Sequence, residues 1–380
     1  MRAPGKIGGA GIDPVLFRSV HRTHREHAVG AGRRSRDVSD DTAPIWDRLA
    51  NFVGKVEYAG DWNLSPEWYG TQGGGWGRST GQVVFEDVSC SGRVTVTAHP
   101  ASSFPGEGRA EWRVLRFNEK TRQSVARIVD GVVDPRCLAT EYLKTVVAVI
   151  AAVTGARETS RAETTSTTSA EQLATLCIGI GGGSIVMFLR AYFPELVIDS
   201  VEIDPVVVSA ARCMGADFDI ILEDANTFVT GRLPGTSAVP DGTPSSSSNP
   251  PYELVYIDAF DGDDCVPKDL CGSDFAGRVA SELSVTGTLV VNLHADDPNW
   301  QRTARVYHTA IGGQSFTCTC KTQGNVILCC TRAPGLVSAL GASDEEAQRQ
   351  LRAFASSTYF GRSLPFRCGD RVTEGYSRVM

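Results

Sequence analysis

The sequence lacks any run of about 18 uncharged apolar residues, the length at which a helix becomes a candidate to span a bilayer. Its nearest approach, "LKTVVAVIAAV" at residues 143–153, is too short for that and predicts a buried helix. Extremes of composition are also absent, because 42% of the 380 residues are hydrophobic and 21% are charged. These values are typical of globular domains, exclude disordered and collagen-like chains, and favour an enzyme-sized fold without a membrane partner.

No secretory signal is recognised, so we expect the 11 cysteines to be reduced thiols in a cytoplasmic or organellar protein. Four of them, Cys318, Cys320, Cys329 and Cys330, lie in "SFTCTCKTQGNVILCCTR", whose alternation and "TQGN" turn predict a hairpin. Neighbouring strand residues point to opposite faces, so four ligands do not converge easily. We expect these cysteines to be small buried residues rather than metal ligands.

Acidic residues are scarce at the start of the chain. Residues 1–36 carry eight Lys or Arg against two acidic residues, a balance of +6. Since the net charge of the whole chain is −7, the remaining residues carry a net charge of −13. We predict a disordered basic arm over residues 1–45, with an organelle transit segment as the alternative. The acidic remainder argues against a nucleic-acid partner and is compatible with a cationic substrate.

Two domains are predicted after the arm. Residues 46–133 begin with a Trp- and Gly-rich segment that holds four of the six tryptophans and is expected to pack on a domain. From residue 81, alternating runs separated by turn residues predict a small antiparallel sheet. Residues 134–333 then alternate apolar strands with helical segments, which predicts a Rossmann-like α/β domain whose parallel sheet has helices on both faces.

Polar sequence interrupts and follows this second domain. The segments near 155–170 and 231–251 are rich in Ser, Thr, Gly and Pro and are predicted surface insertions. Residues 334–380 are predicted to form a C-terminal helix and a tail.

The stretch "LCIGIGGGSIVMFLRAYFPELVIDSVEIDP" contains the first candidate binding residues. Gly179, Gly181 and Gly183 follow a strand and precede a helix that starts near Ser184, so they permit a tight turn and let a ligand approach bare backbone. Glu202 ends the next strand, where its carboxylate is placed to accept both hydroxyls of a ribose. A glycine-rich turn alone is also compatible with NAD, FAD or close packing.

Further carboxylates follow the third and fourth strands. Asp224, in "LEDANTF", is placed to accept a hydrogen bond from an adenine amino group, and Asp258 and Asp261, in "YIDAFDGDD", lie at the mouth of the predicted sheet. Because Asp is common in turns, a solvated loop or cap is the alternative for Asp258 and Asp261.

In order and spacing, "GIGGGS", "VEIDP", "EDANTF" and "DAFDGDD" resemble the spermidine-synthase-like branch of the S-adenosylmethionine-dependent methyltransferase superfamily, over residues 81–333. The resemblance implies S-adenosylmethionine as cofactor, with Glu202 on its ribose and Asp224 and the Ala225 amide on its adenine. It also implies that Asp258 and Asp261 face the acceptor as catalytic residues.

Some positions depart from the aminopropyltransferases of this branch, which place an aspartate directly after the three glycines. Here Ser184 stands instead, and a hydroxyl beside backbone amides suits the carboxylate of S-adenosylmethionine. Their Tyr-His-Glu triplet is replaced by "LATEYLK", and their Asp-Pro by "DGDDCVP". What remains resembles the branch's methyltransferases, which act on protein amines.

We therefore predict methylation of an amine acceptor, a protein lysine or amino terminus. A polyamine aminopropyltransferase and a non-catalytic member of the fold are the alternatives. The oligomeric state, including a homodimer, is left open.

Overall fold

The computed structural model describes residues 81–90, 92–101, 108–118, 121–135, 137–163, 172–232, 250–261, 265–320, 324–356 and 364–380. All of them belong to one compact unit, Ala50–Met380. The predicted basic arm and the Trp- and Gly-rich segment lie outside these ranges, as do residues 164–170 and 233–249 of the predicted insertions. Every helix in the described ranges is too short or too polar to cross a membrane.

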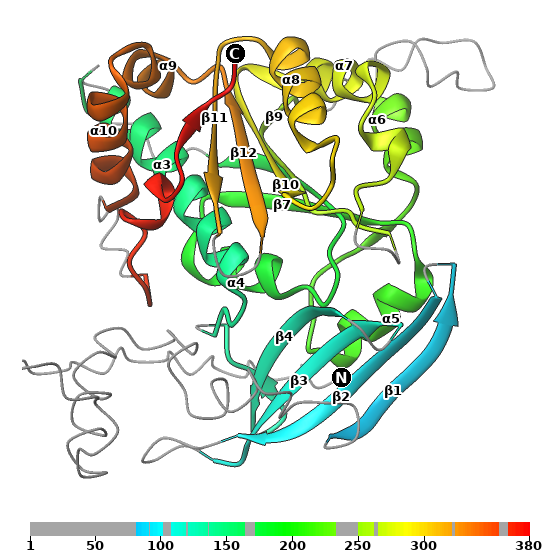
Figure 1. The fold of residues 1–380 in the computed structure, drawn as a ribbon. Helices are drawn as coiled ribbons and strands as arrows, with labels where there is room; N and C mark the ends of the chain where they lie inside the picture. Colours follow the sequence, from blue (N-terminus) through cyan, green and yellow to red (C-terminus); the bar gives the residue numbers. More distant parts are fainter. Residues whose placement is uncertain are drawn as a thin grey trace, which may run out of the picture. The chain divides into compact units, whose positions relative to one another are not determined.

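The first sheet is an antiparallel meander of five strands in sequence order (Figure 1). Its strands are β1 (Gln82–Ser89), β2 (Gly92–Ala101), β3 (Ala110–Phe117), β4 (Thr121–Val129) and β5 (Val132–Val133). Asp130 and Gly131 join the last two strands with φ of 50° and 85°, and positive φ at both residues is what a two-residue hairpin turn of type I′ requires. The predicted small antiparallel sheet is thus confirmed.

The second sheet has eight strands in the order β13-β11-β12-β10-β9-β6-β7-β8. These are β6 (Leu173–Ile178), β7 (Leu196–Glu202), β8 (Ile221–Leu222), β9 (Tyr252–Ile257), β10 (Leu283–His294), β11 (Gln314–Thr319), β12 (Asn325–Thr331) and β13 (Ser377–Arg378). Strands β6 to β10 pair in parallel, as predicted, whereas β11, β12 and β13 add an antiparallel edge. The β11–β12 pair is the hairpin predicted around the four cysteines.

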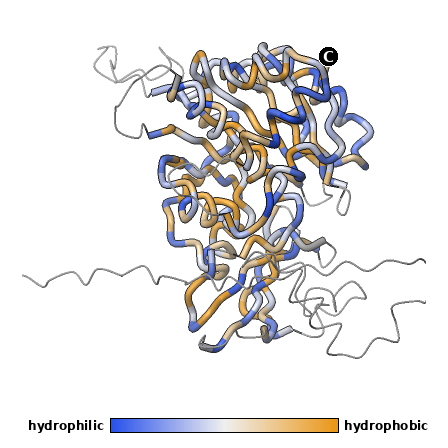
Figure 2. The backbone as a smooth tube through the Cα atoms, turned by 90° about the vertical axis from the view of Figure 1, so that its left-hand side faces the viewer, coloured by the Kyte–Doolittle hydropathy of each residue, from blue (hydrophilic) through white to orange (hydrophobic). Residues whose placement is uncertain are grey.

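Helices cover both faces of the eight-stranded sheet, which confirms the predicted fold class. One core contains residues of α3 (Glu141–Glu163), α4 (Ser184–Tyr192), α9 (Pro334–Gly341) and α10 (Asp344–Ser356). The opposite core contains residues of α6 (Ala225–Arg232), α7 (Ser273–Glu282) and α8 (Trp300–Ile311). Short 3₁₀ helices, η3 (Lys268–Leu270) and η5 (Arg371–Thr373), lie in the connections. Figure 2 shows the hydrophobic segments concentrated inside this part of the chain.

Helix α5 (Pro205–Cys213) connects the two sheets through its apolar face. Its residues Val207 and Ala210, with Met214 directly after the helix, share one buried cluster with Val94 and Leu115 of the small sheet. Because α5 directly follows β7, this packing holds the small sheet beside the carboxyl ends of the parallel strands.

Two predicted boundaries need correction. The helix expected at the apolar run extends to Glu163, so the first nine residues of the predicted 155–170 insertion are helical. Arg157 explains this, because it forms an ion pair with Glu253 and donates to the Thr286 carbonyl over 2.7 Å, both at the sheet. The predicted C-terminal helix and tail are instead two helices, α9 and α10, followed by a strand, β13, that pairs with β11.

Candidate functional site

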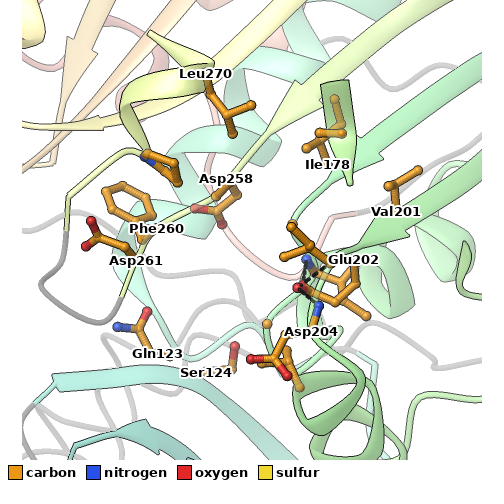
Figure 3. Close-up of a pocket in the computed structure, with 18 of the residues that line it drawn as sticks. Gln123, Ser124, Ile178, Val201, Glu202, Asp204, Asp258, Phe260, Asp261 and Leu270 are labelled. Carbon is orange, nitrogen blue, oxygen red and sulfur yellow. Dashed lines mark hydrogen bonds between the residues drawn. The ribbon is translucent and has the colours of Figure 1, made fainter. Parts of the chain in front are cut away.

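A cavity of about 250 Å³ lies at the carboxyl ends of β6, β7, β8 and β9. Strand β6 has β7 on one side and β9 on the other, so the strand order reverses there. Ligands of open α/β sheets bind at such a reversal, because the connections diverge and leave a crevice. The small sheet closes the cavity on another side, where Gln123 and Ser124 lie opposite Asp258 (Figure 3).

The structure brings eight of the nine predicted site residues into the lining of this cavity. These are Gly179, Gly181, Ser184, Glu202, Asp224, Ala225, Asp258 and Asp261. Gly183 stands apart from the lining: it precedes α4 with φ of 78°, and a Cβ there would lie 3.2 Å from side-chain atoms of Ala216 and Phe218. The positive φ and the close packing therefore explain why position 183 is a glycine.

The glycine turn has the tight geometry that the sequence predicted, but protein atoms occupy part of the space beside it. Gly179 has φ of 76°, and a Cβ on it would lie 2.4 Å from the carbonyl oxygen of Asp258. A side chain at this position would therefore push β9 away from β6. Glycine at position 179 therefore allows the Asp258 backbone to lie close to the turn.

Glu202 closes the glycine turn from the end of β7. Its Oε2 accepts the Ile180 amide over 3.1 Å, and its Oε1 accepts the amides of Ile203 and Asp204 over 3.0 and 3.1 Å. Burial raises the pKa of this carboxyl, and the three amide hydrogen bonds oppose that rise. A carboxylate has about four acceptor positions, so Oε2 retains one for a ligand hydroxyl.

Asp224 and Ala225 lie where the chain enters α6. Asp224 Oδ1 accepts the Thr227 amide over 3.0 Å, which makes Asp224 the N-cap of the helix. Asp224 and the buried Ala225 both line the cavity wall. Ile203, directly after Glu202, adds an apolar surface that is 59% exposed.

Asp258 follows β9 and accepts three side-chain hydrogen bonds. Tyr256 and Tyr142 donate their hydroxyls to Oδ2 over 2.7 and 3.2 Å, and Asn292 donates its Nδ2 to Oδ1 over 2.7 Å. Burial raises the pKa of Asp258, and these donors oppose the rise, the Asn292 bond most strongly. Burial, and next the Asp258 charge, raise the pKa of Tyr142 well above its ordinary value, so this tyrosine stays a donor.

Asp261 lines the cavity four residues before Cys265 and contacts the same loop. Its Oδ1 accepts the Cys265 amide over 3.0 Å, and its own amide donates to the Cys265 carbonyl over 2.9 Å. These bonds match the loop role that was the alternative reading of an Asp here. A role toward the acceptor stays a prediction.

Ser184 also lines the cavity, and its hydroxyl already has a partner. Its Oγ donates to the Val125 carbonyl of β4 over 3.1 Å. On the same strand, Ser124 Oγ accepts the Gly182 amide over 2.9 Å. The glycine turn and the start of α4 are thus attached to the small sheet by two serines.

The cavity wall is strongly acidic. Its acidic residues number seven, namely Glu202, Asp204, Glu223, Asp224, Asp258, Asp261 and Asp269, and its described lining contains no Lys, Arg or His. Such a wall attracts cationic ligands and repels anionic ones. Asp204 has a structural role besides, because its Oδ1 accepts the Val206 amide and caps α5.

Sequence reasoning missed three residues of this site: Tyr142, Asn292 and Ser124. Tyr142 lies in "LATEYLK", which indicated only the loss of a motif, and Asn292 is the next-to-last residue of the apolar run "TLVVNL". A polar residue at the carboxyl end of a predicted strand was the available signal for Asn292. Ser124 had none, because it lies in the small sheet.

Comparison with known proteins finds relatives of two kinds. The human eEF1A lysine and N-terminal methyltransferase is 27% identical over 135 residues, which are 33% of this chain and 18% of that protein. The polyamine aminopropyltransferase of Chromobacterium violaceum is 27% identical over 168 residues, or 42% of this chain and 58% of that enzyme. Both kinds are those that the motifs predicted, which confirms the resemblance to the spermidine-synthase-like branch.

The match covers only part of these relatives, because this chain spans less than two thirds of the length of either. Among solved structures, human methyltransferase-like protein 13 in complex with SAH aligns with 56% of this chain and 93% of that one, at 21% identity and a TM-score of 0.43. No family model matches the chain.

Proposed function

We propose that this protein is an S-adenosylmethionine-dependent methyltransferase that methylates an amine, on a protein lysine or amino terminus. One observation carries the proposal: Glu202, Asp224 and Asp258, from the ends of three strands, line a single cavity with no basic side chain in its described wall. That arrangement suits a cationic donor and an amine acceptor. It supplies no partner for an acidic acceptor.

The cavity residues fit an adenosyl group. Glu202 Oε2 retains an acceptor position for a ribose hydroxyl, and Asp224 lines the same cavity as the exposed apolar side chain of Ile203, which would cover one face of a purine ring. The buried amide of Ala225 follows on the same wall. When bound, S-adenosylmethionine supplies a methyl group activated by a sulfonium.

Asp258 is the residue best suited to receive the acceptor amine. Three donors occupy three of its acceptor positions and leave about one on Oδ1 for an N–H of the amine. An amine of ordinary pKa about 10.4 must lose a proton before its lone pair can attack the methyl carbon. Asp258 would orient the neutral amine by accepting a hydrogen bond from its N–H. Transfer would form the N–C bond, break the S–C bond to release the neutral thioether, and give a methylammonium whose proton passes to solvent.

The test uses the purified chain, S-adenosylmethionine labelled in its methyl group, and a host lysate as the source of acceptors. We expect binding by calorimetry and label on a protein lysine or amino terminus by mass spectrometry. An absence of binding by S-adenosylmethionine and by S-adenosylhomocysteine would refute the assignment.

A second candidate is a polyamine aminopropyltransferase, which would use decarboxylated S-adenosylmethionine. The lack of any basic side chain in the described lining favours it, because that donor has no carboxylate to hold. Putrescine incubated with the decarboxylated donor separates the two functions. Spermidine formed at an enzyme-like rate would establish the second candidate and overturn the first.

A further inference from the structure

Hydrogen-bond donors are rare in the cavity wall, which matters for any ligand that carries a carboxylate. Among the described lining residues, the side chains with a donor are those of Gln123, Ser124, Tyr142, Ser184 and Asn226. A carboxylate brought among seven acidic residues needs donors that are not already engaged, because a buried unpaired charge is costly. The donors that remain therefore decide where such a group binds.

Three of these side chains are engaged or badly placed. Tyr142 donates to Asp258 over 3.2 Å, and Ser184 donates to the Val125 carbonyl over 3.1 Å. Asn226 follows Ala225 in α6, at the end of the cavity assigned to adenine, and its Oδ1 accepts from Arg278 over 2.6 Å.

Of the other two, Gln123 and Ser124 on β4, Ser124 contacts the glycine turn, because its hydroxyl acts as an acceptor. It is buried on β4, and its Oγ accepts the Gly182 amide over 2.9 Å. A hydroxyl has one hydrogen to donate as well, and that of Ser124 has no acceptor among the described residues. Its donor capacity is therefore left for a ligand in the cavity that it lines.

A second donor lies next to Ser124. The Gly181 amide has no acceptor in the described part of the chain, although the amides of Gly179, Ile180 and Gly182 are all bonded. A Cβ on Gly181 would lie 3.0 Å from Ser124 Oγ, which shows how closely the turn approaches this side chain. An O–H and an N–H without a partner in the described part of the chain are thus neighbours, as binding of the two oxygens of one carboxylate requires.

We propose that Ser124, together with the Gly181 amide, binds the carboxylate of the donor's methionine group and so selects S-adenosylmethionine over its decarboxylated form. The inference rests on the proposed function. With adenine at Asp224 and ribose at Glu202, which accepts the Ile180 amide, the remainder of the donor reaches the next residue, Gly181, beside Ser124. Figure 3 shows Glu202 and Ser124 in the wall of the same pocket. The small sheet is then part of the donor site.

The experiment measures the affinity of S-adenosylmethionine and of its decarboxylated form, which differ only in the carboxylate, by calorimetry on Ser124→Ala and the parent. We expect the parent to prefer S-adenosylmethionine and the variant to lose about tenfold or more of that preference, the range for a hydrogen bond to a charged group. Equal losses for both ligands would show that Ser124 only attaches the turn, and unchanged affinities would equally overturn the inference.

Ser184→Ala is the matched control, since it removes a hydroxyl that lines the same cavity but donates to Val125. It should change both affinities by the same factor; a selective loss in this variant alone would move the carboxylate to Ser184. Should Ser124→Ala fail to fold, Ser124→Cys is used instead, because it nearly keeps the side-chain volume and has a weaker donor. The ratio of the two donor affinities is then measured on that variant. If neither donor binds the parent, the proposed function itself fails, a result distinct from binding without selectivity.

Discussion

Asn292 donates its side-chain amide to Asp258, with 2.7 Å between Nδ2 and Oδ1, while its own Oδ1 accepts the amide of Asn325 over 3.0 Å. Asn292 is only 2% exposed, so water does not compete for these bonds. Asn325 fixes which end of the Asn292 amide faces Asp258. Asn292, held by Asn325, therefore orients the Asp258 carboxylate and lowers its pKa against the effect of burial.

Replacing Asn292 should change the pH dependence of the proposed reaction. The Asn292 hydrogen bond lowers the pKa of Asp258 against the effect of burial, so Asn292→Leu, of similar shape but without a donor, raises that pKa further. If ionised Asp258 is required, the acid limb of the pH–rate profile should move up by about 1 to 2 pH units. Asn325→Leu, one bond farther away, should move it less. An unchanged acid limb in Asn292→Leu would argue against a role for ionised Asp258.

Asp258→Asn should retain the fold and donor affinity but lose turnover, the pattern of an interaction used mainly in the transition state. Its new NH₂ group faces donors, so we also expect a loss of about 1 to 3 kcal/mol in unfolding free energy. Single-turnover rates of the parent and of Asp258→Asn are compared at a temperature well below that at which either protein unfolds. Asp261→Asn is the control and should have the smaller effect, since Asp261 bonds Cys265 in its own loop. Parent-like turnover in Asp258→Asn would return Asp258 to a structural role.

The difference in unfolding free energy between the parent and Asp258→Asn should change with pH in a defined direction. Because the pKa of Asp258 is raised in the folded protein, the folded state binds this proton more tightly than the unfolded chain does. Its favourable contribution is complete below the unfolded pKa of about 3.9 and is lost as pH rises through the folded pKa. The unfolding free energy of the parent minus that of Asp258→Asn should therefore fall with rising pH in this window. Denaturant unfolding at several pH values measures it, and a difference that rises instead would mean a lowered pKa.

Glu202→Ala should weaken S-adenosylmethionine binding by about 1.5 to 3 kcal/mol, the range for a lost hydrogen bond to a charged group. The substitution also removes the acceptor of the Ile180, Ile203 and Asp204 amides, so thermal stability should fall. Glu202→Gln, which retains one acceptor oxygen, separates the two effects. Calorimetry that finds parent-like affinity in a folded Glu202→Ala protein would remove Glu202 from the donor site.

Ile203→Ser should weaken donor binding by about 1 kcal/mol while leaving stability nearly unchanged, because the side chain is 59% exposed and would lose its apolar contact only in the complex. Val285→Ser is a control, since Val285 is 88% exposed and outside the cavity lining. Both variants are compared by calorimetry and thermal unfolding. Equal donor affinities in the two would place the purine elsewhere.

The sequence by itself determined the layers of the fold and most of the cavity wall. Apolar strands alternating with helices specify a parallel sheet, and a parallel sheet brings the residues after its strands to one edge. Glu202, Asp224 and Asp258 could be predicted for that reason, since each needs only its own strand to be recognised. The β11–β12 hairpin was predictable from alternation and a turn in the same way.

Only the tertiary structure decided what these residues contact. Tyr142 and Asp258 are 116 positions apart, and Ser124 and Gly182 are 58 apart, so no local pattern pairs them. Their contacts depend on α3 packing against the sheet and on the small sheet packing against α5, which are sums of many apolar contacts without a sequence signature. The same packing engages the Ser184 hydroxyl with the Val125 carbonyl and brings the Ser124 hydroxyl, the acceptor of the Gly182 amide, into the cavity lining. Hydrogen bonds are directional and a hydroxyl has one hydrogen to donate, so the packing determines which serine has already donated its hydrogen within the protein.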